Sequence, residues 1–425
     1  MMQPWWSHPG RLTGFFIIPL YAFLVYVVPA QWPNVIVLRA PDYIHRGYAG
    51  VGLLMLGSLT FFSFLGARIV VRRAAPRPSC IASPVLLGVG AVTIAAYVVW
   101  FFPIVLHAQL MLERDELSQA PGITSFSQMG VPFVLSCIYC ARVAGQRFSS
   151  LVRGQFWAIV FLTLIRMVVW KERLAAIEVF VPAALLILTY GMPRAKGKRA
   201  LRSAIALGGP FLAVPLLMLV FGVTEYFRSW TTYAHTQRAP LVEFMLARVT
   251  TYYYTALNNG AGLLATRHGE WPAYKMLFTA QWIYKLPAGI GDWVYQITTG
   301  PRAHPTDEFL SRFGDIEFNN MSGLFTIIYD LGIVGGAFYF AALGLAAGML
   351  YRSMVRGGRV GALLYPPIFV GLLEVLRIAY VNSSRCILIF GGAYLILSQM
   401  RSSEEASSVD ARERARSMPL AAGPS

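Results

Sequence analysis

Charged side chains interrupt several apolar stretches of the sequence, and these residues are the best candidates to carry chemistry. Asp330 lies in TIIYDLGIVGG, Glu178 in LAAIEVFVP and Arg166 in LTLIRMVVW. A charged side chain at the centre of a bilayer costs about 2.5–3.5 kcal/mol on insertion scales, so it normally faces a bundle interior or a water-filled cavity. The three stretches therefore predict a polar site enclosed by apolar helices.

The arginines of this set are suited to phosphate, because a guanidinium binds phosphate oxygens in a bidentate fork. The alternative is that each charge belongs to a structural pair, such as Glu374 with Arg377 three residues later, or a neighbouring glutamate with Arg173. The candidate residues are Arg166, Arg173, Arg228, Arg248, Arg377 and Arg385, with the carboxylates Glu172, Glu178 and Asp330 and the polar residues Asn319, Asn320 and Tyr252.

The elements that must position these residues are membrane helices. The 425 residues are 56% hydrophobic and 13% charged, with a mean hydropathy of +0.55. Soluble domains are about 45–50% apolar and about 25% charged, so the composition predicts an all-α, polytopic membrane protein. We expect no secretory signal peptide, since the first apolar run is long enough to span. The ten predicted spans are about 12–30, 48–71, 84–106, 123–141, 154–170, 174–191, 203–223, 323–350, 361–380 and 386–400.

Basic residues concentrate in one alternating set of connections, at 72–79, 142–153, 193–202 and 352–359. The positive-inside rule places that set, and therefore both termini, in the cytoplasm. Residues 1–223 then form helices one to seven and 323–400 helices eight to ten. The polar tail 401–425 is expected to be cytoplasmic and disordered. All the candidate charges fall in the outer half of the membrane, which predicts a cavity open to the exterior.

The long connection 224–322 is the large external loop of this topology. It holds eight basic residues and several tryptophans and tyrosines. Tyrosine and tryptophan faces stack on sugar rings, although aromatic residues also anchor helices at the membrane interface. The stretch 241–260 predicts a helix that ends at Gly260, with Arg248 and Tyr252 on one face because they are four residues apart.

Metal, nucleotide and nucleic-acid binding are not predicted. Cys137 and Cys140 form a C-x-x-C inside an apolar segment, which favours helix packing, and the single D-x-E at Asp315 and Glu317 is too little for a metal site. The sequence contains no G-x-x-x-x-G-K-[ST] loop. The net charge of +16 follows from the short basic loops, so we expect neither a metal, another cofactor nor a nucleic-acid partner.

The stretch NNMSGLFTIIYDLGIVGGAFYFAALGLAAGMLY resembles a pattern of the bacterial O-antigen polymerases, the Wzy-type oligosaccharide repeat-unit polymerases. The matching positions are Asn320, Tyr329, Asp330, Gly332 and Gly335. The stretches WKERLAAIEVFVP and TEYFRSW are also similar to that family, as is the layout of ten spans with one large external loop before the eighth. Together the three stretches cover about a fifth of the chain.

This resemblance implies a GT-C-like membrane glycosyltransferase related to the O-antigen ligases, located in the bacterial inner membrane with its site facing the periplasm. It would polymerise undecaprenyl-diphosphate-linked oligosaccharide repeat units of O-antigen or exopolysaccharide, with lipid diphosphate as the leaving group. A chain-length regulator and a flippase are implied partners, besides membrane lipids. The arginines would stabilise the departing diphosphate, while Glu172, Glu178 or Asp330 would take the acceptor proton. Asn319 and Asn320 would hydrogen-bond sugar hydroxyls.

Two other functions fit part of the sequence. An O-antigen ligase would share the fold and the donor, and the Asn-Asn…Asp-x-Gly stretch favours the polymerase over it. A flippase or transporter of lipid-linked oligosaccharides would require internal repeats and polar residues at both depths of the membrane. No repeat is found, and the buried charges lie on one side only, so this function is the less favoured.

Overall fold

The computed structural model describes residues 3–31, 41–69, 79–81, 83–107, 124–169, 172–191, 203–205, 207–211, 241–266, 275–286, 289–300, 304–314 and 318–402. The regular structure within these residues is helical, apart from two three-residue strands that pair antiparallel, β1 (Ser79–Ile81) and β2 (Met400–Ser402). Seven of the described helical segments are long and apolar enough to cross a membrane. The predicted all-α polytopic class is confirmed at this level.

The seven candidate spans follow the predicted positions. The first, Pro9–Ala30, joins α1 (Pro9–Leu12), α2 (Ile18–Ala22) and α3 (Val28–Gln31) through single π-helical turns. The others contain α4 (Ala49–Arg68), α5 (Ser83–His107), α6 (Gly130–Val143), α7 (Ser150–Val169), α8 (Arg173–Tyr190) and α14 (Gly323–Val355).

Within the described ranges, seven helical segments rather than the ten predicted are long enough to span. The helices at the last two predicted positions, α15 (Arg359–Glu374) and α16 (Ser384–Gln399), have 16 residues each. At 1.5 Å per residue each is about 24 Å long, less than the ~30 Å of a hydrocarbon core. The seventh predicted span, 203–223, lies mostly outside the described residues.

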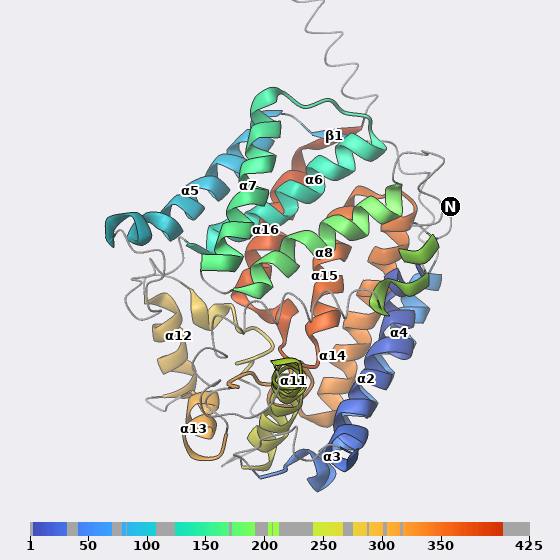
Figure 1. Cartoon of the computed structure of the whole chain (residues 1–425), viewed down its shortest axis with the longest axis vertical. Helices are drawn as coiled ribbons and strands as arrows, with labels where there is room; N and C mark the ends of the chain where they lie inside the picture. Colours follow the sequence, from blue (N-terminus) through green and yellow to red (C-terminus); the bar gives the residue numbers. More distant parts are fainter. Residues whose placement is uncertain are drawn as a thin grey trace, which may run out of the picture.

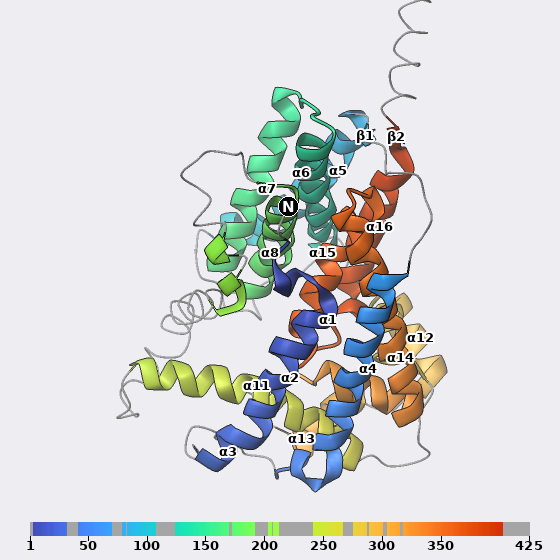
Figure 2. The same ribbon diagram turned by 90° about the vertical axis from the view of Figure 1, so that its right-hand side faces the viewer.

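Helices α4 and α14 run side by side along the lower right of the molecule (Figure 1) and remain adjacent in the perpendicular view (Figure 2). Their backbones approach closely at glycines. A Cβ on Gly348 would lie 2.3 Å from the Ser63 carbonyl oxygen, and one on Gly66 would lie 2.2 Å from that of Leu345. Small residues that allow such approach are typical of helix pairs in membranes.

Described residues that flank the basic loops lie near one another at one end of the helical assembly. The β1–β2 pair joins the chain before α5 to the chain after α16. Arg352 at the end of α14 donates to the carbonyl of Ala67 at the end of α4 (2.6 Å), and Arg142 at the end of α6 donates to that of Gly191 after α8 (3.3 Å). The opposite end, at the bottom of Figure 1, carries α11 and α13.

The helix α11 (Leu241–Ala265) lies across the long axis of the molecule and is seen almost end-on in Figure 1. The prediction that this helix ends at Gly260 is wrong. Gly260 lies within α11, at the point where this helix crosses the start of α14. A Cβ at this position would lie 2.9 Å from Cβ of Phe325. The close crossing, rather than a helix end, accounts for the glycine. Two shorter helices of the same connection are α12 (Ile290–Thr299) and α13 (Pro305–Arg312).

Helix α14 is interrupted at Gly332, whose φ of 75° and ψ of 175° are not helical. Such a conformation is accessible to glycine and strained for other residues. The interruption comes two residues after Asp330. The D-x-G part of the motif therefore combines a buried carboxylate with a break in the helix that carries it.

Candidate functional site

Glu172 is the centre of a cluster of buried and partly buried charges where α7 ends and α8 begins. It lies in the short connection between α7 and α8. Arg166, near the end of α7, binds Oε2 of Glu172 through Nε at 2.7 Å and Nη2 at 2.6 Å. Arg385, at the start of α16, binds Oε1 through Nη2. One carboxylate thus holds two arginines from different helices.

The remaining contacts of Arg166 fix its orientation. Its Nη1 donates to Oγ of Ser127 at 2.9 Å, and its guanidinium lies 4.4 Å from the centre of the Trp100 ring. Arg166 is 2% exposed, so its charge depends on these partners and on Glu172. A short 3-10 helix, Thr124–Met129, supplies Ser127.

A second carboxylate lies beside Arg385. Oε2 of Glu178 is 3.5 Å from Nη1 of Arg385, and Glu178 is only 1% exposed. Neither oxygen of Glu178 forms a hydrogen bond of ordinary geometry to another described residue. Glu178 and Glu172 lie in and just before α8, so both carboxylates approach Arg385 from the same helix.

The charges of Glu172 and its arginines stabilise each other. Burial by itself would raise the pKa of Glu172, but the adjacent guanidiniums of Arg385 and Arg166 outweigh it and hold the pKa below its ordinary value. Glu172 is therefore an anion at neutral pH. The structure brings together Arg166, Arg385, Glu172 and Glu178 of the predicted set; Arg173 begins α8 directly after Glu172.

A second cluster joins the end of α15 to α11. Arg377 binds Oε2 of Glu374 through Nε at 2.5 Å, the pair that the sequence left open as a structural alternative. Arg377 also donates to the hydroxyl of Tyr252 at 2.6 Å. Next to it, burial and then the Glu374 carboxylate raise the pKa of Tyr253. This cluster holds α11 against the C-terminal end of α15.

Arg248 and Tyr252 both contact Phe318, as expected if they share a face of α11. The Arg248 guanidinium is 4.7 Å from the centre of the Phe318 ring, and the Tyr252 ring centre is 6.1 Å from it. Phe318 precedes the two predicted sugar-binding asparagines. Asn319 is exposed, whereas Asn320 is partly buried.

Asp330 binds backbone rather than an arginine. Its Oδ2 accepts hydrogen bonds from the N–H groups of Phe278 and Thr279, both at 2.7 Å, and from the Thr279 hydroxyl at 2.9 Å. The carboxylate is fully buried. It therefore attaches the segment 275–286 of the connection between α11 and α14 to α14, close to the break at Gly332.

That segment brings a basic residue that the sequence analysis did not select. Lys285 follows the turn that Asp330 holds. The residue is exposed, and partial desolvation followed by the charge of Arg385 lowers its pKa. Lys285 therefore lies within electrostatic reach of the Glu172 cluster. A lysine in a long external loop carries no sequence signal that would have distinguished it from the other basic residues there.

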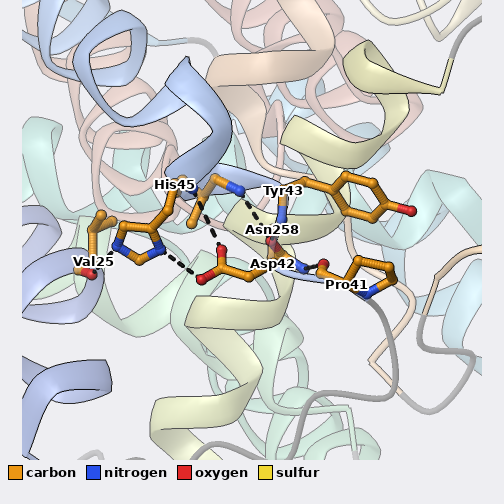
Figure 3. A network of polar contacts seen from close by, with 7 residues as sticks. Val25, Pro41, Asp42, Tyr43, His45 and Asn258 are labelled. Carbon is orange, nitrogen blue, oxygen red and sulfur yellow. Dashed lines mark hydrogen bonds and ion pairs between the residues drawn. The ribbon is translucent and has the colours of Figure 1, made fainter.

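Asn258 and Asn259, adjacent on α11, were also missed as positioning residues. The Oδ1 of Asn258 accepts from the N–H groups of Tyr43 (2.7 Å) and Ile44 (3.1 Å), and its Nδ2 donates to the carbonyl of Pro41 (2.9 Å; Figure 3). Asn259 donates instead to the carbonyl of Phe318 at 2.9 Å. The sequence does contain one indication of their role. Asparagine usually favours turns, so two adjacent asparagines inside a predicted helix suggest that their side chains bind another segment.

A histidine beside this contact links the first two candidate spans. In Figure 3 the ring of His45 lies between Asp42 and Val25. Its Nδ1 is 2.7 Å from Oδ2 of Asp42, and its Nε2 is 2.9 Å from the carbonyl oxygen of Val25. That carbonyl is available because the residue four positions later is Pro29, which has no N–H to donate.

Arg228 lies outside the described residues, so its place relative to the cluster is not described. Within the described ranges, no group of three or more histidine, cysteine, aspartate or glutamate side chains could hold a metal ion. Cys137 and Cys140 are buried on α6 and form no disulfide with each other. Comparison of the whole chain with protein-family models, with curated proteins and with solved structures gives no match.

Proposed function

We propose that the protein is a GT-C-like glycosyltransferase that polymerises undecaprenyl-diphosphate-linked oligosaccharide repeat units at the outer face of the bacterial inner membrane. Both termini would be cytoplasmic, and the Glu172 cluster would face the periplasm. The natural partners would be lipid-linked glycan, membrane lipids, a chain-length regulator and a flippase. The proposal unites the apolar helices, the resemblance of the NNMSG…DLG stretch and the character of the charged cluster.

The observation that carries the proposal is the convergence of Arg166 and Arg385 on a single carboxylate at the end of apolar helices. Two guanidiniums held at one point form a site for a ligand with several anionic oxygens. A lipid-linked diphosphate has such oxygens at the depth of the membrane surface. Lys285, within electrostatic reach of Arg385, adds a third positive charge.

In the proposed reaction an acceptor sugar hydroxyl attacks the anomeric carbon of the lipid-linked glycan. A new glycosidic bond forms, the bond from that carbon to the phosphate oxygen breaks, and the lipid diphosphate leaves with the electron pair. Arg166 and Arg385 would stabilise the growing negative charge. Of the three candidate carboxylates we assign the hydroxyl proton to Glu178, because it lies beside Arg385, whereas Asp330 binds the turn at Thr279 and Glu172 binds the two arginines.

Deletion of the gene in its host, followed by electrophoresis of the surface glycans, tests this function. If the protein is a polymerase, lipid A core in the deletion strain should carry a single repeat unit, because units are still transferred to the core but are not joined to one another. A full-length ladder retained on undecaprenyl diphosphate would instead identify an O-antigen ligase. Unchanged lipopolysaccharide and exopolysaccharide would contradict both functions.

A further inference from the structure

We propose that Glu172 is a resident substitute for phosphate, which occupies Arg166 and Arg385 until a diphosphate displaces it. The identity of the natural ligand, a lipid-linked diphosphate, rests on the proposed function. The displacement itself concerns only the anion and the two arginines. It makes Glu172 a gate on the donor site rather than a fixed structural partner.

The geometry of the carboxylate is the first reason. Nε and Nη2 of Arg166 both point at Oε2 of Glu172, and Nη2 of Arg385 points at Oε1. These are the donors that a guanidinium offers to two oxygens of a phosphate group. A phosphate cannot use them while the carboxylate does, so the two anions compete for the same N–H groups.

Access to the cluster is the second reason. The Arg166 side chain is 3% exposed, while those of Glu172 and Arg385 are 19% and 33% exposed. The carboxylate thus lies between a buried arginine and one that reaches the surface. In addition, Nη1 of Arg385 is buried, and its anionic neighbour, Oε2 of Glu178, lies 3.5 Å away without a hydrogen bond between them. A ligand with more oxygens than a carboxylate would satisfy this donor.

The backbone position of Glu172 is the third reason. It precedes the first residue of α8, with φ of −95° and ψ of 82°, and its side chain makes no capping bond to that helix. Its side chain can therefore leave the arginines without the loss of a helical hydrogen bond. Glu178, by contrast, lies inside α8 and is held in place by the helix.

The local charge favours the exchange. Glu172 offers a single negative charge to Arg166, Arg385 and the nearby Lys285, whereas a diphosphate offers at least two. Because Glu172 is tethered beside the arginines, its effective concentration is high and it lowers the apparent affinity for any competing anion. If the arginines are free for about a tenth of the time, the apparent affinity falls about tenfold.

Equilibrium binding of radiolabelled inorganic pyrophosphate to the purified full-length protein in lipid nanodiscs tests the inference. We expect Glu172→Gln to bind pyrophosphate about tenfold more tightly than the wild type. Glu308→Gln is the matched control, because Glu308 is an exposed carboxylate that pairs with Arg312 on α13. It should leave the affinity unchanged. Adding Arg385→Ala to Glu172→Gln should abolish the gain.

If Glu172 were only a structural partner of the arginines, Glu172→Gln would not increase the affinity for pyrophosphate. Equal or weaker binding by a folded Glu172→Gln protein would overturn the inference. If that variant does not fold, Glu172→Asp takes its place, since the shorter side chain keeps the charge but cannot reach both arginines. A gain of a few-fold in pyrophosphate affinity supports displacement, and a loss overturns it.

Geranylgeranyl diphosphate in the same nanodiscs separates a lipid headgroup from a free anion. A gain with both ligands supports a site for the diphosphate of a lipid, and a gain with pyrophosphate alone supports a gate for a soluble anion. No gain with either overturns the gate. The outcome is independent of the glycan test: tighter binding together with unchanged glycans after deletion would keep the gate and reject the polymerase.

Discussion

Arg385 is the residue that links the two carboxylates of the proposed donor site, since it binds Glu172 and lies 3.5 Å from Glu178. Its planar guanidinium reaches both at once. A lysine would keep the charge but present a single ammonium group. Substitution of Arg385 by lysine therefore tests the geometry of the guanidinium separately from its charge.

We predict that Arg385→Lys lowers glycan polymerisation about 10- to 100-fold in a complemented deletion strain, because a point charge replaces preorganised donors. Ladder length on a glycan gel, at matched membrane expression, measures the effect. Arg312→Lys, an exposed arginine of α13, is the control. Wild-type ladders from Arg385→Lys would show that the bidentate geometry of the guanidinium is not needed for the reaction.

Asp330 is predicted to act through the segment that it holds. Asp330→Ala removes three hydrogen bonds from Phe278 and Thr279, so the turn should open. Limited trypsin digestion, followed by mass spectrometry at Lys275 and Lys285, should then show cleavage several-fold faster than in the wild type. Asp292→Asn, an exposed carboxylate on α12, is the control. Equal rates would remove Asp330 from this role.

His304 should make stability depend on pH. Its Nδ1 accepts from the N–H of Thr306 at the start of α13, and burial lowers its pKa. The folded protein therefore binds this proton less readily than the unfolded chain, so the contribution is present above about pH 6.5 and declines as the pH falls below it. His304→Asn, a capping residue that does not titrate, should reduce the drop in unfolding midpoint between pH 7.5 and 5.5. An unchanged drop would contradict the assignment.

At the scale of elements, the contact between α4 and α14 depends on the absence of side chains. Gly348→Ala would place a methyl group against the backbone of Ser63, and we predict a destabilisation of about 1–3 kcal/mol from overpacking. Gly57→Ala on α4 is the control, because nothing lies within 4 Å of its added Cβ. Unfolding midpoints in detergent measure both. Equal midpoints would show that the helices can separate locally.

The sequence predicts these elements better than their contacts. Apolar runs located the spans because hydropathy and length determine whether a helix can cross a bilayer. The apolar run at 361–380 predicted a helix that is too long at its C-terminal end. The helix ends at Glu374, and the chain then turns so that Arg377 pairs with Glu374. The sequence predicted that Arg166, Glu172 and Arg385 line one polar site. It did not indicate that Glu172 binds both arginines, because contacts between distant helices leave no mark in a single sequence.

At the scale of the whole molecule, α11 is the element that connects three distant parts of the chain. Asn258 holds it to the connection before α4, Asn259 to the segment before α14, and Tyr252 to Arg377. We predict that Asn258→Ala costs about 2–4 kcal/mol, because buried N–H groups of Tyr43 and Ile44 lose their acceptor. Thermal unfolding measures it, with exposed Asn319→Ala as control. A loss of stability no larger than that of the control would show that Asn258 does not anchor α11.

The bond between Asn258 and Tyr43 also sets an order of assembly during synthesis. The two residues are 215 positions apart in the chain. At about 5–20 residues per second, a ribosome needs about 10–40 s to produce the second partner after the first. Throughout that interval the connection between the first two spans has no amide to satisfy its backbone. Until α11 has been made, only water or another segment can accept hydrogen bonds from the N–H groups of Tyr43 and Ile44.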